Sequence, residues 1–232
     1  MSAVEYTEAN ATLDLAGALA EMISMPLSNN KSVVWLISGG SSLPVAVEVA
    51  KLLSKTDQSK LSVTLVDEKH GPENHDQSNW RQLHEQGFAL NGAQVSGILH
   101  GNDSLQRTAD RFEVMLAQWL SNADFVIGQF GIGDGYHTGG IVARTIAAQT
   151  MDKLTCGYDR NSEGKITVTP GLIAKLDVAF INSMGMSKKP LVRHFCYSDE
   201  SIENEPTQAL KHARRTMLYS DVLPSELISS NR

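Results

Sequence analysis

The chain alternates short apolar segments with amphipathic helical segments, and this alternation limits its fold more than any other feature. Residues 32–37 (Ser-Val-Val-Trp-Leu-Ile) and 61–66 (Leu-Ser-Val-Thr-Leu-Val) are mostly apolar and have the length of a strand. Strands that are apolar on both faces are typical of parallel sheets with helices on both sides and right-handed crossovers. The sequence therefore predicts a three-layer α/β/α fold around a mainly parallel sheet.

Other segments continue this pattern along the chain. Further strands are predicted at residues 95–99, 124–128, 166–169 and 178–182, and helices at residues 13–25, 45–53, 104–120 and 206–220. No repeat and no linker rich in proline or serine divides the chain. We therefore expect residues 1–232 to form a single α/β domain.

The composition excludes several classes of protein. The 26 acidic residues outnumber the 20 basic ones, whereas proteins that bind the nucleic-acid backbone usually carry a basic excess. The polar N-terminus carries Glu5 and Glu8, unlike a secretory signal, and the apolar runs are too short to span a bilayer. Cys156 and Cys196 lie far apart and match no disulfide framework or zinc motif. We expect a cytoplasmic protein without nucleic-acid or membrane partners, either a monomer or a small homo-oligomer.

Polar clusters follow the predicted strands, at the ends where parallel sheets bind ligands. The first cluster, Ser38-Gly-Gly-Ser-Ser42, joins a strand to a helix, and Pro44 suits the first helical turn. Its glycines allow a tight turn, and the backbone N–H groups at a helix start attract anions. The Walker A ending and the dinucleotide fingerprint are both absent from this loop. The cluster predicts either a phosphate site or a helix cap with a tight turn.

A second cluster at residues 67–79 follows the strand at residues 61–66. It concentrates charged and hydrogen-bonding side chains in a loop, where functional groups often lie. His70 and His75 are metal-binding residue types, but their spacing matches no metal motif, so we predict no metal site. The alternative is a solvated loop in which Asn and Ser side chains cap backbone groups.

The third cluster, residues 131–140 (Gly-Ile-Gly-Asp-Gly-Tyr-His-Thr-Gly-Gly), contains five glycines and one histidine. Histidine as a residue type ordinarily titrates near neutral pH, so His137 is a candidate general base or acid; the alternative is a structural histidine. If a helix begins near Gly140, Arg144 lies two turns beyond His137 and faces the same way; otherwise it is a surface arginine. Lys188, after the last predicted strand, is either a ligand for a sugar phosphate or a solvent-facing lysine.

Taken in this order, the clusters resemble motifs of the 6-phosphogluconolactonase family and of the related glucosamine-6-phosphate deaminases. The matching segments are residues 38–44 (family SGG(S/R)TP), 67–79 (DERxVPxxHxxSN), 131–138 (GMGxDGHT), 165–169 (RITLT) and 185–188 (GxxK). The resemblance spans about residues 10–195, and its motifs occur in one order at fitting intervals. It implies a Rossmann-like fold of the sugar-phosphate isomerase/lactonase type.

The resemblance implies hydrolysis of 6-phosphogluconolactone to 6-phosphogluconate in the oxidative pentose phosphate pathway, without metal or organic cofactor. His137 takes the position of the family's catalytic histidine, a general base that activates water, and Asp67 that of a carboxylate lining its active site. The phosphate-binding positions fall on Gly39, Gly40, Ser41, Ser42, Lys69 and Lys188, and Arg144 is a further candidate from its place after the histidine. The implied partner is a small-molecule phosphosugar lactone.

Departures from the family pattern bear on substrate choice. Tyr136 puts a bulky ring where the family has glycine, and Lys69 replaces an arginine and loses its bidentate fork. Residues 139–143 also differ from the family's Ala-Ser-Leu-Phe-Pro.

Two alternatives stay open. One is an aminosugar-phosphate deaminase or isomerase, although residues 138–150 lack the acidic residue those relatives carry. The other is a sugar-phosphate-binding protein that is non-catalytic or has altered specificity.

Overall fold

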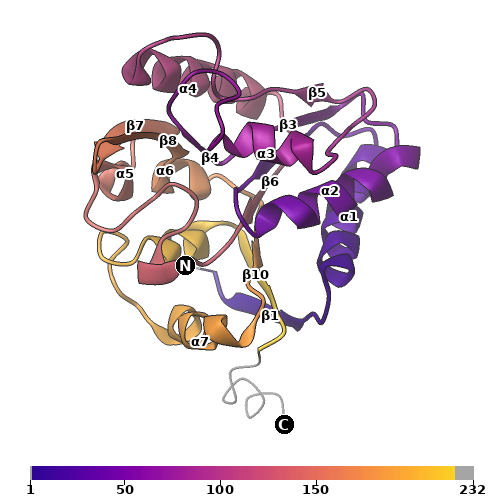
Figure 1. Cartoon of the computed structure of the whole chain (residues 1–232). Coiled ribbons are helices and arrows are strands. Elements are labelled where there is room, and N and C mark those ends of the chain that lie inside the picture. Colours follow the sequence, from indigo (N-terminus) through magenta and orange to yellow (C-terminus); the bar gives the residue numbers. More distant parts are fainter. Residues whose placement is uncertain (1, 223–232) are drawn as a thin grey trace.

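A seven-stranded parallel sheet forms the centre of the structure, a computed structural model that describes residues 2–222 (Figure 1). From one edge to the other its strands are β1 (Val4–Glu8), β10 (Arg215–Ser220), β9 (Val178–Asn182), β6 (Phe125–Phe130), β2 (Val33–Ile37), β3 (Leu61–Leu65) and β5 (Gln94–Val95). Every neighbouring pair in this sheet runs in the same direction. The predicted α/β fold with a mainly parallel sheet is therefore confirmed.

Helices flank this sheet. The α-helices of the described residues are α1 (Thr12–Ser28), α2 (Ser42–Leu52), α3 (Asn79–Glu85), α4 (Leu105–Ser121), α5 (Ile146–Gln149), α6 (Pro170–Ile173) and α7 (Lys189–Tyr197). In Figure 1, α1 and α2 lie to the right of the sheet, α5 and α6 lie to its left, and α4 runs across the top. Strands β2 and β9 are buried along their whole length, and their residues Trp35 and Phe180 belong to the hydrophobic core. Within residues 2–222, no helix is long and apolar enough to cross a bilayer.

A second, antiparallel sheet lies beside the first. Its strands are, in order, β4 (Asp67–Lys69), β8 (Glu163–Val168) and β7 (Thr155–Arg160). Strands β7 and β8 form a hairpin whose two turn residues, Asn161 and Ser162, have φ values of 50° and 64°. Positive φ at both positions is typical of a type I′ turn, whose twist matches that of the paired strands. The prediction contained only residues 166–169 of this hairpin and placed residues 67–69 at a strand end and in a loop.

The order of the strands reverses between β2 and β6. The chain runs outward from β2 to β3 and β5, returns to β6 on the other side of β2, and continues to β9 and β10. At such a reversal the loops after the two central strands diverge and leave a crevice. Here the loops begin at Ser38 and Gly131, and the Ser38 N–H donates to the carbonyl oxygen of Gln129 (3.1 Å). The topology therefore places the serine-glycine cluster beside the glycine-histidine cluster.

The closing helix predicted at residues 206–220 is wrong. This segment consists of a 3-10 helix, η4 (Pro206–His212), followed by strand β10. Strand β10 pairs with both β1 and β9, so the sheet's hydrogen bonds override the helical pattern of the sequence. Strand β1 escaped prediction because it is an edge strand with largely polar residues. Of the strand predicted at residues 95–99, only Val95 is in a strand, at the end of β5.

Candidate active site

A cavity of about 500 Å³ lies at the crevice between β2 and β6. Its walls come from the loops after these strands, from β4 and α3, from the β7–β8 hairpin, and from the 3-10 helix η3 (Met186–Lys188). The predicted site residues that line it are Gly39, Gly40, Ser41, Asp67, Lys69, His137 and Lys188. The cavity thus brings together polar clusters that lie far apart in the sequence.

The charges around the cavity suit an anionic ligand. Cationic side chains outnumber carboxylates among its described lining residues: Lys69, Arg160, Lys165 and Lys188 against Asp67 and Asp134. A polar hollow lined by an excess of one charge concentrates ligands of the opposite charge. The positive charge of the cavity therefore favours binding of a phosphate or carboxylate group, although the chain as a whole is acidic.

The loop after β2 presents residues 38–41 to the cavity, and α2 starts directly after it. Gly40 has a φ of +61°, a left-handed conformation that glycine adopts without strain. Ser42 is different, because it is fully buried and its Oγ donates to Oδ1 of Asn182 in β9 (3.0 Å). That bond ties α2 to the sheet, so the predicted phosphate ligand Ser42 does not line the cavity.

The pairing of β4 with β8 decides which side chains face the cavity. Asp67 lies opposite Thr167, and Lys69 lies opposite Lys165. Because side chains alternate between the faces of a strand, Asp67 and both lysines share the cavity face, and the intervening Glu68 does not. Like charges directly opposite each other repel. An anion in the cavity would relieve the repulsion between Lys69 and Lys165.

Glu68 holds the segment after β4 in place. The residue is 1% exposed, and its carboxylate accepts hydrogen bonds of 2.8–3.0 Å from the backbone N–H groups of Lys69, Asn79 and Trp80 and from the hydroxyl of Ser78. The N–H groups at the start of a helix have no partners within the helix. Glu68 supplies those partners for α3, and it thereby fixes Asn79, which lines the cavity.

Asp67 is a partly buried carboxyl group, and its Oδ1 has no hydrogen-bond partner among the described residues. Burial raises the pKa of Asp67 to about 6, and the nearby Glu68 carboxylate acts in the same direction. The Lys165 ammonium group and the polar groups of Gly39 and Ser38 oppose this rise in pKa. Asp67 lines the cavity as a residue, but Oδ1 itself is buried and has no contact with solvent.

A local hydrogen bond decides which nitrogen of His137 carries the proton. Nδ1 lies 2.7 Å from the backbone carbonyl oxygen of Asp134. A carbonyl oxygen can only accept, so Nδ1 is the donor, and in the neutral ring Nε2 is then the acceptor. Nε2 can therefore take a proton from a water molecule. Gly133 packs so closely that a methyl group there would overlap the imidazole ring.

The cavity also contains cations that were not among the predicted site residues. Arg160 and Lys165 both come from the β7–β8 hairpin, although Lys165 belongs to a recognised motif segment. The available signal was Asn161-Ser162 between two strand-like segments, a pair that suits a hairpin turn. Lys188 was predicted, and its Nζ lies 3.4 Å from Oδ1 of Asp134, which links η3 to the turn before His137.

Arg144 and Tyr136 point elsewhere. No helix begins near Gly140; Arg144 lies in a turn with a φ of +60°, its N–H donates to the carbonyl oxygen of Glu203 (2.8 Å), and it does not line the cavity. The ring of Tyr136 is also absent from the cavity wall and stacks on His194. The bulky side chain at the expected glycine position therefore leaves the cavity open.

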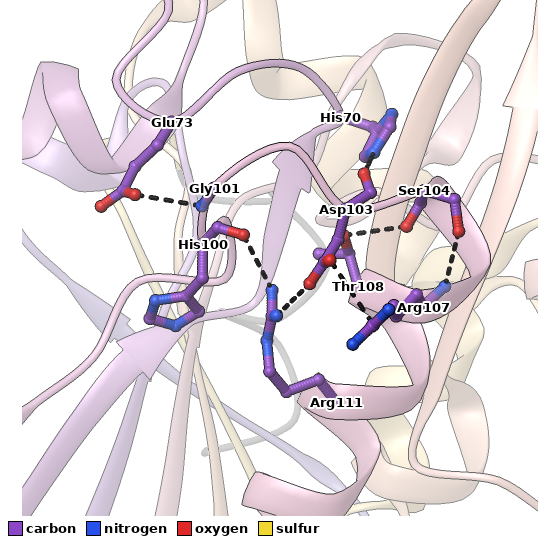
Figure 2. A network of polar contacts seen from close by, with 9 residues as sticks. All are labelled: His70, Glu73, His100, Gly101, Asp103, Ser104, Arg107, Thr108 and Arg111. Carbon is purple, nitrogen blue, oxygen red and sulfur yellow. Dashed lines mark hydrogen bonds and ion pairs between the residues drawn. The ribbon is translucent and has the colours of Figure 1, made fainter.

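The two histidines after β4 have structural hydrogen bonds, and His70 belongs to a polar network beside the second sheet (Figure 2). Nε2 of His70 lies 3.0 Å from the carbonyl oxygen of Asp103, whose carboxylate pairs with Arg111. Nε2 of His75 lies 3.0 Å from the carbonyl oxygen of Lys69. Both histidines therefore donate to carbonyl oxygens and connect segments of the chain. The described part of the chain contains no group of three or more His, Cys, Asp or Glu side chains placed to hold a metal.

Comparison with known proteins identifies the family. A family model for glucosamine-6-phosphate isomerases/6-phosphogluconolactonase matches residues 6–219. This chain belongs to that family. The match to the glucosamine-6-phosphate isomerase/6-phosphogluconolactonase family spans every segment that lines the cavity. No curated protein sequence matches the chain significantly.

Solved structures from both branches of this family have the same fold. A 6-phosphogluconolactonase from Shewanella baltica has a TM-score of 0.75 at 21% identity, with 95% of this chain and 98% of that chain covered. One from Thermotoga maritima has a TM-score of 0.75 at 17% identity, covering 94% and 99%. A monomeric glucosamine-6-phosphate deaminase has a TM-score of 0.74 at 16% identity, covering 93% and 96%. At these identities the likeness shows the fold, and the chemistry has to be argued from the site.

Proposed function

We propose that this family member hydrolyses 6-phosphogluconolactone to 6-phosphogluconate, the lactonase step of the oxidative pentose phosphate pathway. The observation that carries the proposal is the bond between Nδ1 of His137 and the Asp134 carbonyl oxygen, which leaves Nε2 as a base in a cationic cavity. A lactone carbonyl is already electrophilic. Its hydrolysis needs a positioned water, a base, and stabilisation of the developing oxyanion, and it needs no organic cofactor.

The phosphate of the substrate would bind to the loop after β2 and to the facing cations. The N–H groups of residues 39–41 and the start of α2 supply partial positive charge, which favours a phosphate dianion. Lys69, Lys165 and Lys188 add full charges from the other walls. A phosphate held there would orient the lactone carbonyl toward His137, so binding at the phosphate would promote reaction at the carbonyl.

In the proposed reaction, Nε2 of His137 removes a proton from water while the water oxygen attacks the lactone carbonyl carbon. The carbonyl oxygen becomes an oxyanion, which N–H groups of the glycine-rich loop at residues 131–140 would stabilise. The bond to the ring oxygen then breaks, and the ring oxygen receives the proton from Nε2. That transfer regenerates the neutral imidazole of His137, and the resulting carboxylic acid loses its own proton to solvent. The carboxyl group of Asp67, which lines the cavity, would orient the water or a sugar hydroxyl.

The alternatives predict different chemistry. An aminosugar-phosphate deaminase or isomerase moves a proton at C2 and resembles the relatives that carry an acidic residue after the histidine motif. The carboxylates among the described cavity residues are Asp67 and Asp134, and residues 138–150 contribute none. A non-catalytic sugar-phosphate-binding protein would use the cations and would have no need of a free Nε2. The lactonase proposal accounts for both the cations and the histidine.

The test is hydrolysis of freshly generated 6-phosphogluconolactone above its spontaneous rate. We expect a large acceleration by the wild type, its loss in His137→Ala, and retained binding of 6-phosphogluconate by calorimetry in that variant. His100→Ala, at an exposed histidine outside the cavity, is the matched control and should hydrolyse normally. Full activity in His137→Ala would remove this histidine from the mechanism. Binding without any wild-type acceleration would favour the binding protein.

A further inference from the structure

Tyr136 adopts a backbone conformation that its side chain disfavours. Its φ is +57°, and Gly135 before it has a φ of +71°. The left-handed region is strained for residues with a Cβ atom, and bulky residues are rarely found there. Glycine adopts the same torsion without strain. The tyrosine is therefore held in this turn by contacts that its side chain makes elsewhere.

Those contacts run from Tyr136 through His194 to a buried carboxylate. The Tyr136 ring stacks on the imidazole of His194 in α7, with centroids 4.3 Å apart and planes 30° from parallel. Nε2 of His194 lies 2.5 Å from Oε1 of Glu205, whose side chain is only 9% exposed. Glu205 also accepts hydrogen bonds from Ser198 Oγ (2.8 Å) and Gln208 Nε2 (3.1 Å). Glu205 thus fixes the imidazole, and the imidazole fixes the tyrosine ring.

The turn that contains Tyr136 also orients His137. Asp134 provides the carbonyl oxygen that accepts from His137 Nδ1, and the torsions of Gly135 and Tyr136 set the distance between these two groups. Two other contacts reach this turn. The Gly133 N–H donates to the His137 carbonyl oxygen (2.9 Å), and Lys188 pairs weakly with the Asp134 carboxylate, which is 94% exposed. Neither involves the Tyr136 side chain, which the stack on His194 holds through the buried Glu205.

We propose that Tyr136 and His194 form a positioning pair, whose stack keeps residues 134–137 in the conformation that holds the His137 proton on Nδ1. Without the stack, Tyr136 would relax toward negative φ, and the 2.7 Å bond from Nδ1 would open. The neutral imidazole would then divide between its two tautomers, and fewer molecules would have Nε2 free to accept a proton. The kinetic consequence rests on the proposed function, but the tautomer of His137 can be measured without it.

The test is nitrogen-15 NMR of the imidazole rings at a pH where His137 is neutral. The chain has seven histidines, and the His137 signals are assigned by their loss in His137→Gln. His194→Gln removes the aromatic face but keeps an amide that can donate to Glu205, and Tyr136→Phe keeps the stack. His84→Gln is the matched control, because His84 contacts an aromatic ring, Trp80, away from the cavity.

We expect the wild type, Tyr136→Phe and His84→Gln to show the Nδ1–H tautomer of His137. His194→Gln and Tyr136→Ala should show a mixture of tautomers, with kcat about tenfold lower and KM changed less than about twofold, because the phosphate-binding groups are untouched. These two variants together provide the test if one of them fails to fold.

Wild-type tautomer and wild-type kcat in a folded His194→Gln or Tyr136→Ala variant would overturn the positioning pair. An effect confined to KM would overturn it as well. If the wild type does not hydrolyse the lactone, the proposed function fails, and the tautomer measurement still decides this inference.

Discussion

Replacing Asp67 by asparagine should change how the stability of the protein depends on pH. Burial and the neighbouring Glu68 raise the pKa of Asp67 from its ordinary value of 3.8 to about 6, because the folded state disfavours the ionised form. The difference corresponds to roughly 3 kcal/mol of folding free energy at about 1.4 kcal/mol for each pKa unit. Because the side chain is only partly buried, screening by water reduces the expected effect to about 2 kcal/mol.

The direction of the effect follows from proton binding. Between about pH 4 and pH 6, Asp67 loses its proton in the unfolded chain but keeps it in the folded one. The folded state then binds more protons, so this group lowers wild-type stability as the pH rises through that window. Above about pH 6, Asp67 is ionised in both states and the full penalty is present. Asparagine carries no charge, so Asp67→Asn should gain about 2 kcal/mol over the wild type between pH 4 and pH 7.5.

Urea unfolding at a series of pH values between about 4 and 7.5 measures this gain directly, with tryptophan fluorescence as the probe. Asp134→Asn is the matched control, because it removes a cavity carboxylate that is 94% exposed and should leave the pH dependence unchanged. If the unfolding free energies of wild type and Asp67→Asn stay parallel across this range, the argument from burial is refuted.

Three further tests address other parts of the site. Lys69→Ala and Arg160→Ala should each raise KM for the phosphorylated lactone about tenfold with a smaller effect on kcat, and an unchanged KM in steady-state kinetics would remove that cation from substrate binding. The φ of Gly133 is −98°, which alanine can adopt, but the methyl group of Gly133→Ala would displace the His137 ring. We therefore expect kcat to fall about 100-fold, with unchanged 6-phosphogluconate affinity by calorimetry. A wild-type kcat would contradict this. Glu68→Gln replaces one acceptor oxygen that serves two donors and should destabilise the fold by about 2–4 kcal/mol in thermal unfolding, an effect that a wild-type melting temperature would disprove.

Most of the parallel sheet could be predicted from the sequence, because its central strands and main helices carry their own patterns. Strands β2 and β9 are buried on both faces and are therefore apolar throughout, and α4 follows a helical repeat of apolar residues. Strands β1 and β7 carry weaker patterns, because part of each is exposed. Strand β10 has a helix-like sequence, and only its position between β1 and β9 makes it a strand.

The sequence predicted which loops form the candidate site, but only some of the residues that line it. The loop at residues 39–41, His137 and Lys188 each come after an apolar strand, so their location at the carboxyl edge of the sheet was predictable. Ser42 was predicted as a ligand but does not line the cavity, because its hydroxyl bonds to β9. Arg144 does not line it either, because the chain forms a turn where a helix was expected. Arg160 was not predicted, and it lies at the cavity because a hairpin turn pairs β7 with β8.

The sequence by itself determined the class of fold and the loops in which polar groups would gather, because burial on both faces of a strand requires apolar residues and parallel strands end at one edge. Only the tertiary structure decided that Nδ1 of His137 carries the proton, that the Tyr136 ring turns toward His194, and that Lys69 faces Lys165. These features depend on individual torsions and on pairing between segments far apart in the chain, which local composition does not constrain.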